Sequence, residues 1–308
     1  MPRFLVVAPN WIGDALMAQP LLARLGGQID MLAPEWVAPV ARRMPEVSSV
    51  IATPFVHGPL QLRERWRLGQ SLKENNYSQA FVLPNSWKSA LVPFFAGIPR
   101  RTGYVGEFRY GLLNDSRKAT GATMAAHYAA LGGDGPLSRP RLRVSAEEVE
   151  QARRKFGLSG RYGVLCPGAE YGPAKRWPYF AELSKRLSLP AVVLGSGKDL
   201  EASRGVGGTN LVGKTTLDEA LALIAGAEFI VSNDSGLMHV AAALGRPQVA
   251  LFGSSSPEHT PPQSAGARVL WLHIECSPCF QRECPLGHFR CMRDMTVEMV
   301  LDQLKTIS

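Results

Sequence analysis

Short apolar runs alternate with segments of helical periodicity through the first half of the chain. The apolar runs predict strands at residues 4–8, 29–33, 50–54 and 80–84. The periodic segments predict helices at residues 14–25, 36–44, 60–75 and 88–98. Strands that alternate with helices of this length are typical of βαβ units and a parallel sheet.

A polar, glycine-rich interval at residues 131–161 precedes a second alternation of the same kind. Its predicted strands begin near Tyr162, Ala191, Phe229 and Gln248. A length of 308 residues suits two domains. We therefore expect an α/β protein of two facing, doubly wound, Rossmann-like domains, residues 1–158 and 159–308, with the active site in the interdomain cleft at the carboxyl ends of both sheets. The last helix is expected to pack back on the first domain.

Composition narrows the class of protein. The charged content of 19% and the hydrophobic content of 45% are ordinary for a soluble globular protein. The nearly apolar run at 89–98 is far shorter than the roughly 20 residues of a membrane span, and the N-terminus has no signal-peptide core. A cytoplasmic protein is expected. No G-x-G-x-x-G follows the first strand, which disfavours a nicotinamide dehydrogenase.

The net charge of +8 is carried by the first half. Before residue 159 there are 20 lysines and arginines against 12 aspartates and glutamates, while the rest of the chain is balanced. This asymmetry suggests that the first domain meets an anion such as phosphate, nucleic acid or a membrane face. Taken singly, most of the charges are expected only to solvate helix faces, as in Arg63, Arg65, Arg67 and Lys73.

Asp14 stands where the first predicted strand gives way to a helix. An acid in the first turn of a helix can simply offset the helix dipole. Alternatively, the strand carries it to the edge of the sheet where chemistry is usually done. The residues alone leave both readings open.

The segment 232–247 predicts a phosphate site. A strand ends at Asp234, Ser235 and Gly236, and the helix that follows offers free N–H groups in its first turn. His239, one turn into this helix, could reach a phosphate or a sugar hydroxyl. Asp234 would repel a phosphate, so we expect it to be a cap or an orienting residue. Capping alone would explain the same pattern equally well.

Two more strand ends carry polar side chains. Lys175 and Arg176 follow a short rigid loop and suit a diphosphate, although a solvated pair is as probable. Gly253 and several hydroxyls follow another strand. Three such ends around one cleft favour a ligand site more than each motif alone.

Four of the five cysteines lie close together near the C-terminus. They are Cys276, Cys279, Cys284 and Cys291, with His288 nearby. Their C-x2-C-x4-C-x6-C spacing offers enough ligands for a structural zinc ion, but reduced thiols are as probable. A zinc-containing nucleic-acid-binding protein is thus one rival function, and a sugar-nucleotide epimerase, which can share the two-domain plan, is another.

Several motifs together resemble those of a known family. The stretches PNWIGD, VLPNSWKSALVPFFAGIPRRTGY, PGAEYGPAKRWP and NDSGLMHVAAALGRP are similar to the inverting glycosyltransferase family 9, the ADP-heptose:lipopolysaccharide heptosyltransferases of GT-B fold. The resemblance runs through nearly the whole chain to about Pro262, and the cysteine-rich stretch departs from it.

The resemblance implies transfer of a second heptose from ADP-heptose to the heptosylated, anionic inner core of lipid A, or transfer at another core position. Asp14 would be the catalytic base and no metal or other cofactor would be required. The implied donor-binding residues are Gly13, Gly168, Lys175, Arg176, Asp234, Ser235, Gly236, Leu237, His239 and Gly253. The expected acceptor-binding residues are Asn10, Lys88, Arg100 and Arg101, with Arg109 nearby. The enzyme would work at the cytoplasmic face of the inner membrane and bind no nucleic acid.

Overall fold

The chain forms two compact units, Met1–Pro140 and Arg141–Ser308. The computed structural model describes residues 1–55, 58–119 and 123–307. The boundary falls before the expected residue 158 because helix α7 (Ala146–Lys155) belongs to the second unit. A capping box at Ser145 starts this helix, and Lys155 forms an ion pair with Glu219 of α9 (Leu217–Ala225).

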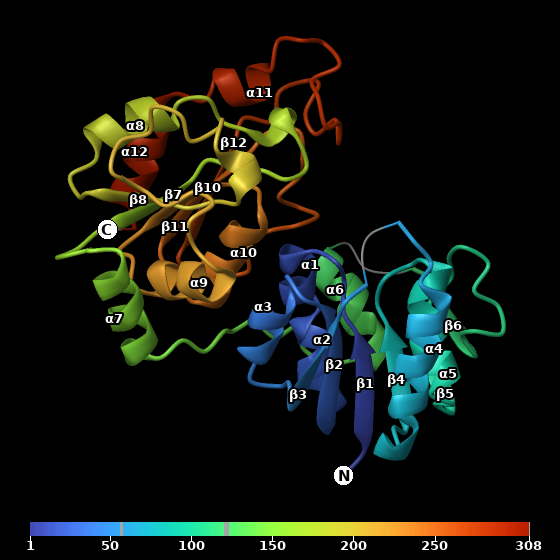
Figure 1. The fold of residues 1–308 in the computed structure, drawn as a ribbon. Helices are drawn as coiled ribbons and strands as arrows, with labels where there is room; N and C mark the ends of the chain where they lie inside the picture. Colours follow the sequence, from blue (N-terminus) through green and yellow to red (C-terminus); the bar gives the residue numbers. More distant parts are fainter. Residues whose placement is uncertain (56–57, 120–122, 308) are drawn as a thin grey trace. The chain divides into compact units, whose positions relative to one another are not determined.

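The first unit is a six-stranded parallel sheet in the order β3-β2-β1-β4-β5-β6 (Figure 1). Its strands are β1 (Arg3–Val7), β2 (Gln28–Pro34), β3 (Ser49–Thr53), β4 (Gln79–Val82), β5 (Arg100–Tyr104) and β6 (Asp115–Arg117). Its α-helices are α1 (Ile12–Met17), α2 (Gln19–Leu25), α3 (Ala38–Arg42), α4 (Leu62–Ser71), α5 (Leu91–Phe95) and α6 (Met124–Ala129).

The two faces of this sheet are buried by different helices. Helices α1, α2, α3 and α6 contact one another on one face, and α4 and α5 lie together on the other. Leu5 and Val7 of β1 join Val92 of α5 in one core cluster. Burial on both faces explains why the central strands read as continuous apolar runs rather than alternating ones.

The structure differs from the sequence prediction in one helix and two strands of this unit. The helix expected at 14–25 is divided between α1 and α2, because Pro20 has no N–H with which to continue the hydrogen bonds of α1. Strands β5 and β6 were missed, since the sequences RRTGY and DSR contain no apolar run. The other predicted strands of this unit lie within a few residues of the observed ones.

The second unit repeats the plan with a sheet in the order β12-β11-β10-β7-β8-β9. Its strands are β7 (Gly163–Cys166), β8 (Ala191–Val193), β9 (Thr209–Asn210), β10 (Ile230–Asn233), β11 (Gln248–Phe252) and β12 (Ala267–Trp271). Its α-helices are α7, α8 (Phe180–Arg186), α9, α10 (Gly236–Ala243), α11 (Arg290–Arg293) and α12 (Val297–Lys305). Every strand pair in both sheets is parallel.

The last helix, α12, packs within its own unit. Val297, Val300 and Leu304 lie on one helical face and are buried in the core cluster that includes Leu251 of β11. The core of its own unit thus accounts for the apolar face of this helix, and the expected packing on the first domain stays a prediction. Three apolar residues at this spacing need a sheet to cover them, and the second sheet provides one.

Each sheet reverses its strand order at one point. The reversal lies between β1 and β4 in the first unit and between β7 and β10 in the second. In open parallel sheets, ligands bind just beyond the carboxyl ends of the strands at this switch point. The residues that follow these four strands are therefore the first candidates for a site.

Candidate active site

Asn233 joins the two strand ends at the switch point of the second unit. It is the last residue of β10 and is fully buried. Its Nδ2 donates to the carbonyl oxygen of Pro167 at 2.7 Å, and its Oδ1 accepts the N–H of Trp177 at 3.1 Å. These two bonds fix the loop after β7, which carries Lys175, against the end of β10.

Lys175, Asp234 and Ser255 form a buried polar cluster beyond these strands. Lys175 Nζ lies 2.5 Å from Asp234 Oδ2, and the same oxygen accepts a hydrogen bond from Ser255 Oγ at 2.5 Å. The side chains of Lys175 and Asp234 are 16% and 6% exposed. Asp234 therefore orients the lysine, one of the two roles expected for it, and the pair leaves the lysine ammonium at the edge of the sheet.

The first turn of α10 offers backbone donors beside this cluster. Ser235 is its N-cap residue but makes no capping bond, and its hydroxyl lies 3.1 Å from the hydroxyl of Ser232. Gly236 and Leu237 are partly exposed. Ser254 Oγ is buried and finds no partner among the described residues. Open N–H groups, a lysine and a spare hydroxyl suit an anionic oxygen ligand.

His239 lies one turn into α10 and is buried. Burial lowers the pKa of its imidazole to about 4, although Asp234 acts in the opposite direction. The ring is therefore neutral at physiological pH. It can exchange a hydrogen bond with a ligand without adding a charge next to Lys175.

Two glycines expected at the donor site are explained by packing. A Cβ at Gly168 would lie 2.2 Å from Cγ of Asp199, and one at Gly253 would lie 2.4 Å from Sδ of Met292. Both positions need glycine because a buried neighbour occupies the space of a side chain. Arg176 is half-buried, and its Nε has no partner within the described part of the chain.

Asp14 lies in the first turn of α1, directly beyond β1. The N-cap residue of this helix is Trp11, with no capping bond from its side chain. Asp14 is partly exposed, and its charge adds to burial in raising the pKa of Tyr128. Gly13, also expected at the donor site, is buried in the same turn of the first unit. Asp14 thus reaches the carboxyl edge of its sheet, as the reading of it as a base requires.

A pocket opens at the switch point of the first unit. It has a volume of about 70 Å³ and lies beyond the ends of β1, β2, β3 and β4. It contains Asn10 and Lys88, two of the four expected acceptor residues. Lys88 Nζ donates to the carbonyl oxygen of Gly58 at 3.0 Å. The rest of the lining is Val7, Ala8, Leu32, Pro34, Trp36, Thr53, Phe55, Arg65, Pro84, Ser86, Ser89 and Val92.

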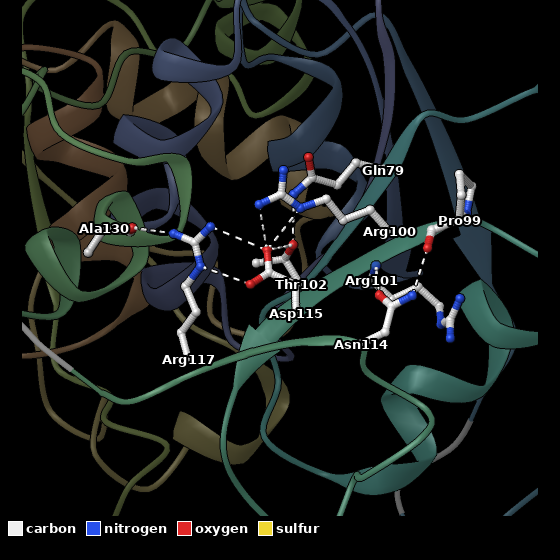
Figure 2. A network of polar contacts seen from close by, with 9 residues as sticks. All are labelled: Gln79, Pro99, Arg100, Arg101, Thr102, Asn114, Asp115, Arg117 and Ala130. Atoms are coloured by element: carbon white, nitrogen blue, oxygen red, sulfur yellow. Dashed lines mark hydrogen bonds and ion pairs between the residues drawn. The ribbon is translucent and has the colours of Figure 1, made fainter.

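Arg100 and Arg101 lie at the opposite edge of this sheet. They begin β5, level with Gln79 at the start of β4. Figure 2 shows Arg100 directed at Asp115, with an Nη2–Oδ2 distance of 2.8 Å. Arg101 donates to the carbonyl oxygens of Ile98 and Leu112. The structure therefore does not support the expected acceptor role, because these arginines stabilise the amino ends of the last strands.

Two other arginines expected at or near the surface are buried. Arg109 is 2% exposed and donates to the carbonyl oxygens of Pro84 and Tyr104, which makes it a structural residue. Arg65 is 7% exposed and lines the pocket, so the reading that it only solvates a helix face is wrong. The helical spacing indicated a surface helix but could not show that Phe55 and Leu60 lie against this side chain.

The four clustered cysteines are all reduced. Cys276 Sγ lies 4.0 Å from His288 Nε2, and Cys284 Sγ accepts the N–H of Phe289. Across the described residues, no three histidine, cysteine or acidic side chains converge closely enough to hold a metal ion. A zinc site would require these side chains to move, and it stays a prediction. In the same part of the chain no helix is long and apolar enough to cross a bilayer.

Comparison with known proteins agrees with this geometry. The model of glycosyltransferase family 9 (heptosyltransferase) matches residues 65–290. The chain is 45% identical to lipopolysaccharide heptosyltransferase 2 of Escherichia coli, covering 99% of this chain and 98% of that one. It is 39% identical to lipooligosaccharide heptosyltransferase 2 of Haemophilus influenzae, covering 99% of both.

The solved structures give the same result. The E. coli ADP-heptose heptosyltransferase II structure superposes with a TM-score of 0.88 at 43% identity, covering 99% of this chain and 98% of that one. A family 9 structure from Veillonella parvula gives 0.85 at 20% identity, covering 99% and 97%, which supports the fold alone. The two-sheet GT-B fold expected from the sequence is confirmed, and the chain belongs to glycosyltransferase family 9, the heptosyltransferases.

Proposed function

We propose that this glycosyltransferase moves heptose from ADP-heptose to the heptosylated inner core of lipopolysaccharide, with inversion at the anomeric carbon. The observation that carries the proposal is the cluster of Lys175, Asp234 and Ser255 at the start of α10, at the switch point of the second sheet. The relatives that match 99% of the chain, at 39% to 45% identity, are heptosyltransferases of the second kind, which supports the choice of acceptor.

The second unit would bind the donor. The diphosphate would lie against the first turn of α10, with Lys175 as its fixed cation. Neutral His239 would accept or donate a bond to phosphate or sugar. The charge that grows on the ADP oxygen as the glycosidic bond breaks would be met by Lys175 and by the helix N–H groups.

Asp14 would act as the general base. Its carboxylate would take the proton of an acceptor hydroxyl while that oxygen forms a bond to the anomeric carbon. The bond between this carbon and the ADP oxygen would break on the opposite face, so that ADP leaves with the electron pair. One proton moves to Asp14 and one glycosidic bond replaces another. This chemistry would need no metal or other cofactor.

The first unit would bind the acceptor in the pocket beyond β1–β4. Asn10 and Lys88 lie in it, and the excess of basic residues before residue 159 favours an anionic glycolipid. We expect the enzyme to reach this lipid from the cytoplasm, at the face of the inner membrane. We expect no nucleic acid among its partners.

The test is a reconstituted transfer reaction. Purified protein would be given ADP-heptose and lipid A acceptors with and without the first heptose, and ADP release and acceptor mass would be followed. The expected result is one added heptose on the heptosylated acceptor only. Addition to the acceptor that lacks heptose would indicate another core position, and ADP-heptose consumption without acceptor gain would contradict the proposal.

A further inference from the structure

Arg65 is a buried cation for which no described residue supplies a carboxylate partner. Its Nε donates to the carbonyl oxygen of Leu60 at 2.7 Å and its Nη1 to that of Lys88 at 3.2 Å. Its Cζ lies 4.0 Å from the centre of the Phe55 ring. These partners are neutral, and no ion pair of Arg65 with a described residue exists. Such burial disfavours the charged form unless an anion compensates it.

The guanidinium still has hydrogen-bonding capacity. Within the described part of the chain, Nη2 of Arg65 makes no hydrogen bond, and the side chain lines the pocket. Arg109 provides a contrast, because both of its terminal nitrogens donate to protein oxygens. Carbonyl groups and the Phe55 ring hold the Arg65 side chain in place without neutralising it. A guanidinium that is held in place but not neutralised is positioned to bind an anionic ligand, in addition to any part it has in stabilising the fold.

The surrounding pocket selects for an oxyanion. It contains the two cations Arg65 and Lys88, and none of its lining residues is acidic. Trp36 and Phe55 give it apolar walls on which a sugar ring can pack. An anionic saccharide matches both properties, because its charge would pair with the guanidinium while its ring faces the aromatic side chains.

We infer that Arg65 is a specificity residue of this enzyme, receiving a phosphate or carboxylate group of the acceptor saccharide in the pocket of the first unit. This inference rests on the proposed function, since it assigns the acceptor's anion to one residue. The pairing is present in the ground state, so it affects acceptor affinity more than the rate of the chemical step.

The decisive experiment combines variants with modified acceptors. In Arg65→Gln, the KM for the acceptor is expected to rise roughly 10- to 100-fold, as for loss of a charge-assisted bond, with the KM for ADP-heptose unchanged. Arg65→Lys keeps the charge but not the two-pronged guanidinium geometry. Its acceptor KM should lie between the values for wild type and Arg65→Gln. Arg67→Gln, an exposed arginine on the same helix, is the matched control and should behave as wild type.

The acceptor would also be offered dephosphorylated and, separately, with its carboxylates esterified. Wild type should lose affinity for one of these two forms, which identifies the anion, and Arg65→Gln should show no further loss with that form. If wild type transfers heptose to both modified forms with unchanged KM, the inference is overturned even where Arg65→Gln cannot be purified. An unchanged acceptor KM in a folded Arg65→Gln overturns it too. Wild type that transfers to no acceptor contradicts the proposed function instead.

Discussion

The two units share one topology but hold their key cations differently. At the edge of the second sheet, Lys175 is paired with Asp234 and partly neutralised. At the edge of the first sheet, Arg65 is buried among carbonyl groups and an aromatic ring. A paired lysine suits a leaving group whose charge grows during the reaction, whereas an unpaired arginine suits an anion that is charged throughout. Under the proposed function, the same fold would serve two kinds of anion recognition.

Removing the proposed base, Asp14, tests the first unit most strongly. Asp14→Asn is expected to lower kcat by at least about 100-fold, because loss of a general base removes that much of the acceleration. ADP affinity should be unchanged, since Asp14 belongs to the first unit and the donor is proposed to bind the second. Turnover at saturating substrates and calorimetry with ADP would measure the two effects. Near-normal turnover would reduce Asp14 to a residue that only offsets the dipole of α1.

His239 links the donor site to pH. Because burial lowers its pKa from 6.5 to about 4, the unfolded chain binds more protons between these values, and stability falls as the pH drops through this window. The loss should amount to about 3 kcal/mol at pH 4. The free energy of unfolding, measured with urea at pH 4 to 7, should depend less steeply on pH in His239→Gln than in wild type. His259→Gln, at an exposed site, is the control and should keep the wild-type dependence of stability on pH.

If the stability of His239→Gln depended on pH as steeply as that of wild type, the ring would not be buried in its neutral form. The opposite sign, with stability rising toward pH 4, would show that Asp234 pairs with the imidazolium. Either result would change the electrostatic description of the second unit, because a charged imidazole would then lie beside Lys175.

Lys175→Ala tests the paired cation. ADP affinity should fall roughly 10- to 100-fold, since a charge-assisted bond to phosphate is worth about 1.5 to 3 kcal/mol. Lys185→Ala, on the exposed side of α8, should leave ADP binding unchanged. Titration calorimetry would measure both. Equal ADP affinity in the two variants would remove Lys175 from the donor site and weaken the comparison with Arg65.

Sequence patterns predicted the architecture better than the site. Continuous apolar runs identified the central strands, because strands buried on both faces need them. The edge strand DSR carries no such signal, and its place depends on Arg100 and Arg117 around Asp115. Asp14 and Asp234, which lie in the connections after central strands, could be placed at the carboxyl edges of the sheets because topology fixes those positions.

Residues whose role depends on distant packing could not be predicted in this way. Arg65 has the spacing of a surface helix, and only the fold brings Phe55 and Lys88 around it. The sequence indicated Ser255 only as one of several hydroxyls after β11. Its hydrogen bond to Asp234, seen only in the structure, identifies it as part of the polar cluster. The acceptor role expected for Arg100 and Arg101 lost support for the converse reason: charge alone does not show at which end of a strand a residue lies.

The smallest effect is expected for the double variant Arg100→Gln, Arg101→Gln. These residues start β5, while the pocket lies beyond the other end of the same sheet. A five-residue strand is about 16 Å long, which is twice the screening length of about 8 Å near physiological ionic strength. The acceptor KM should therefore stay within about twofold of wild type, while lost bonds to Ile98 and Leu112 lower the free energy of unfolding. The acceptor KM of the double variant and of Arg65→Gln would be measured at low and at physiological salt. A large, salt-dependent rise in the KM of the double variant would show that the acceptor extends to the amino edge of the sheet. The assignment of acceptor recognition to the pocket would then be incomplete.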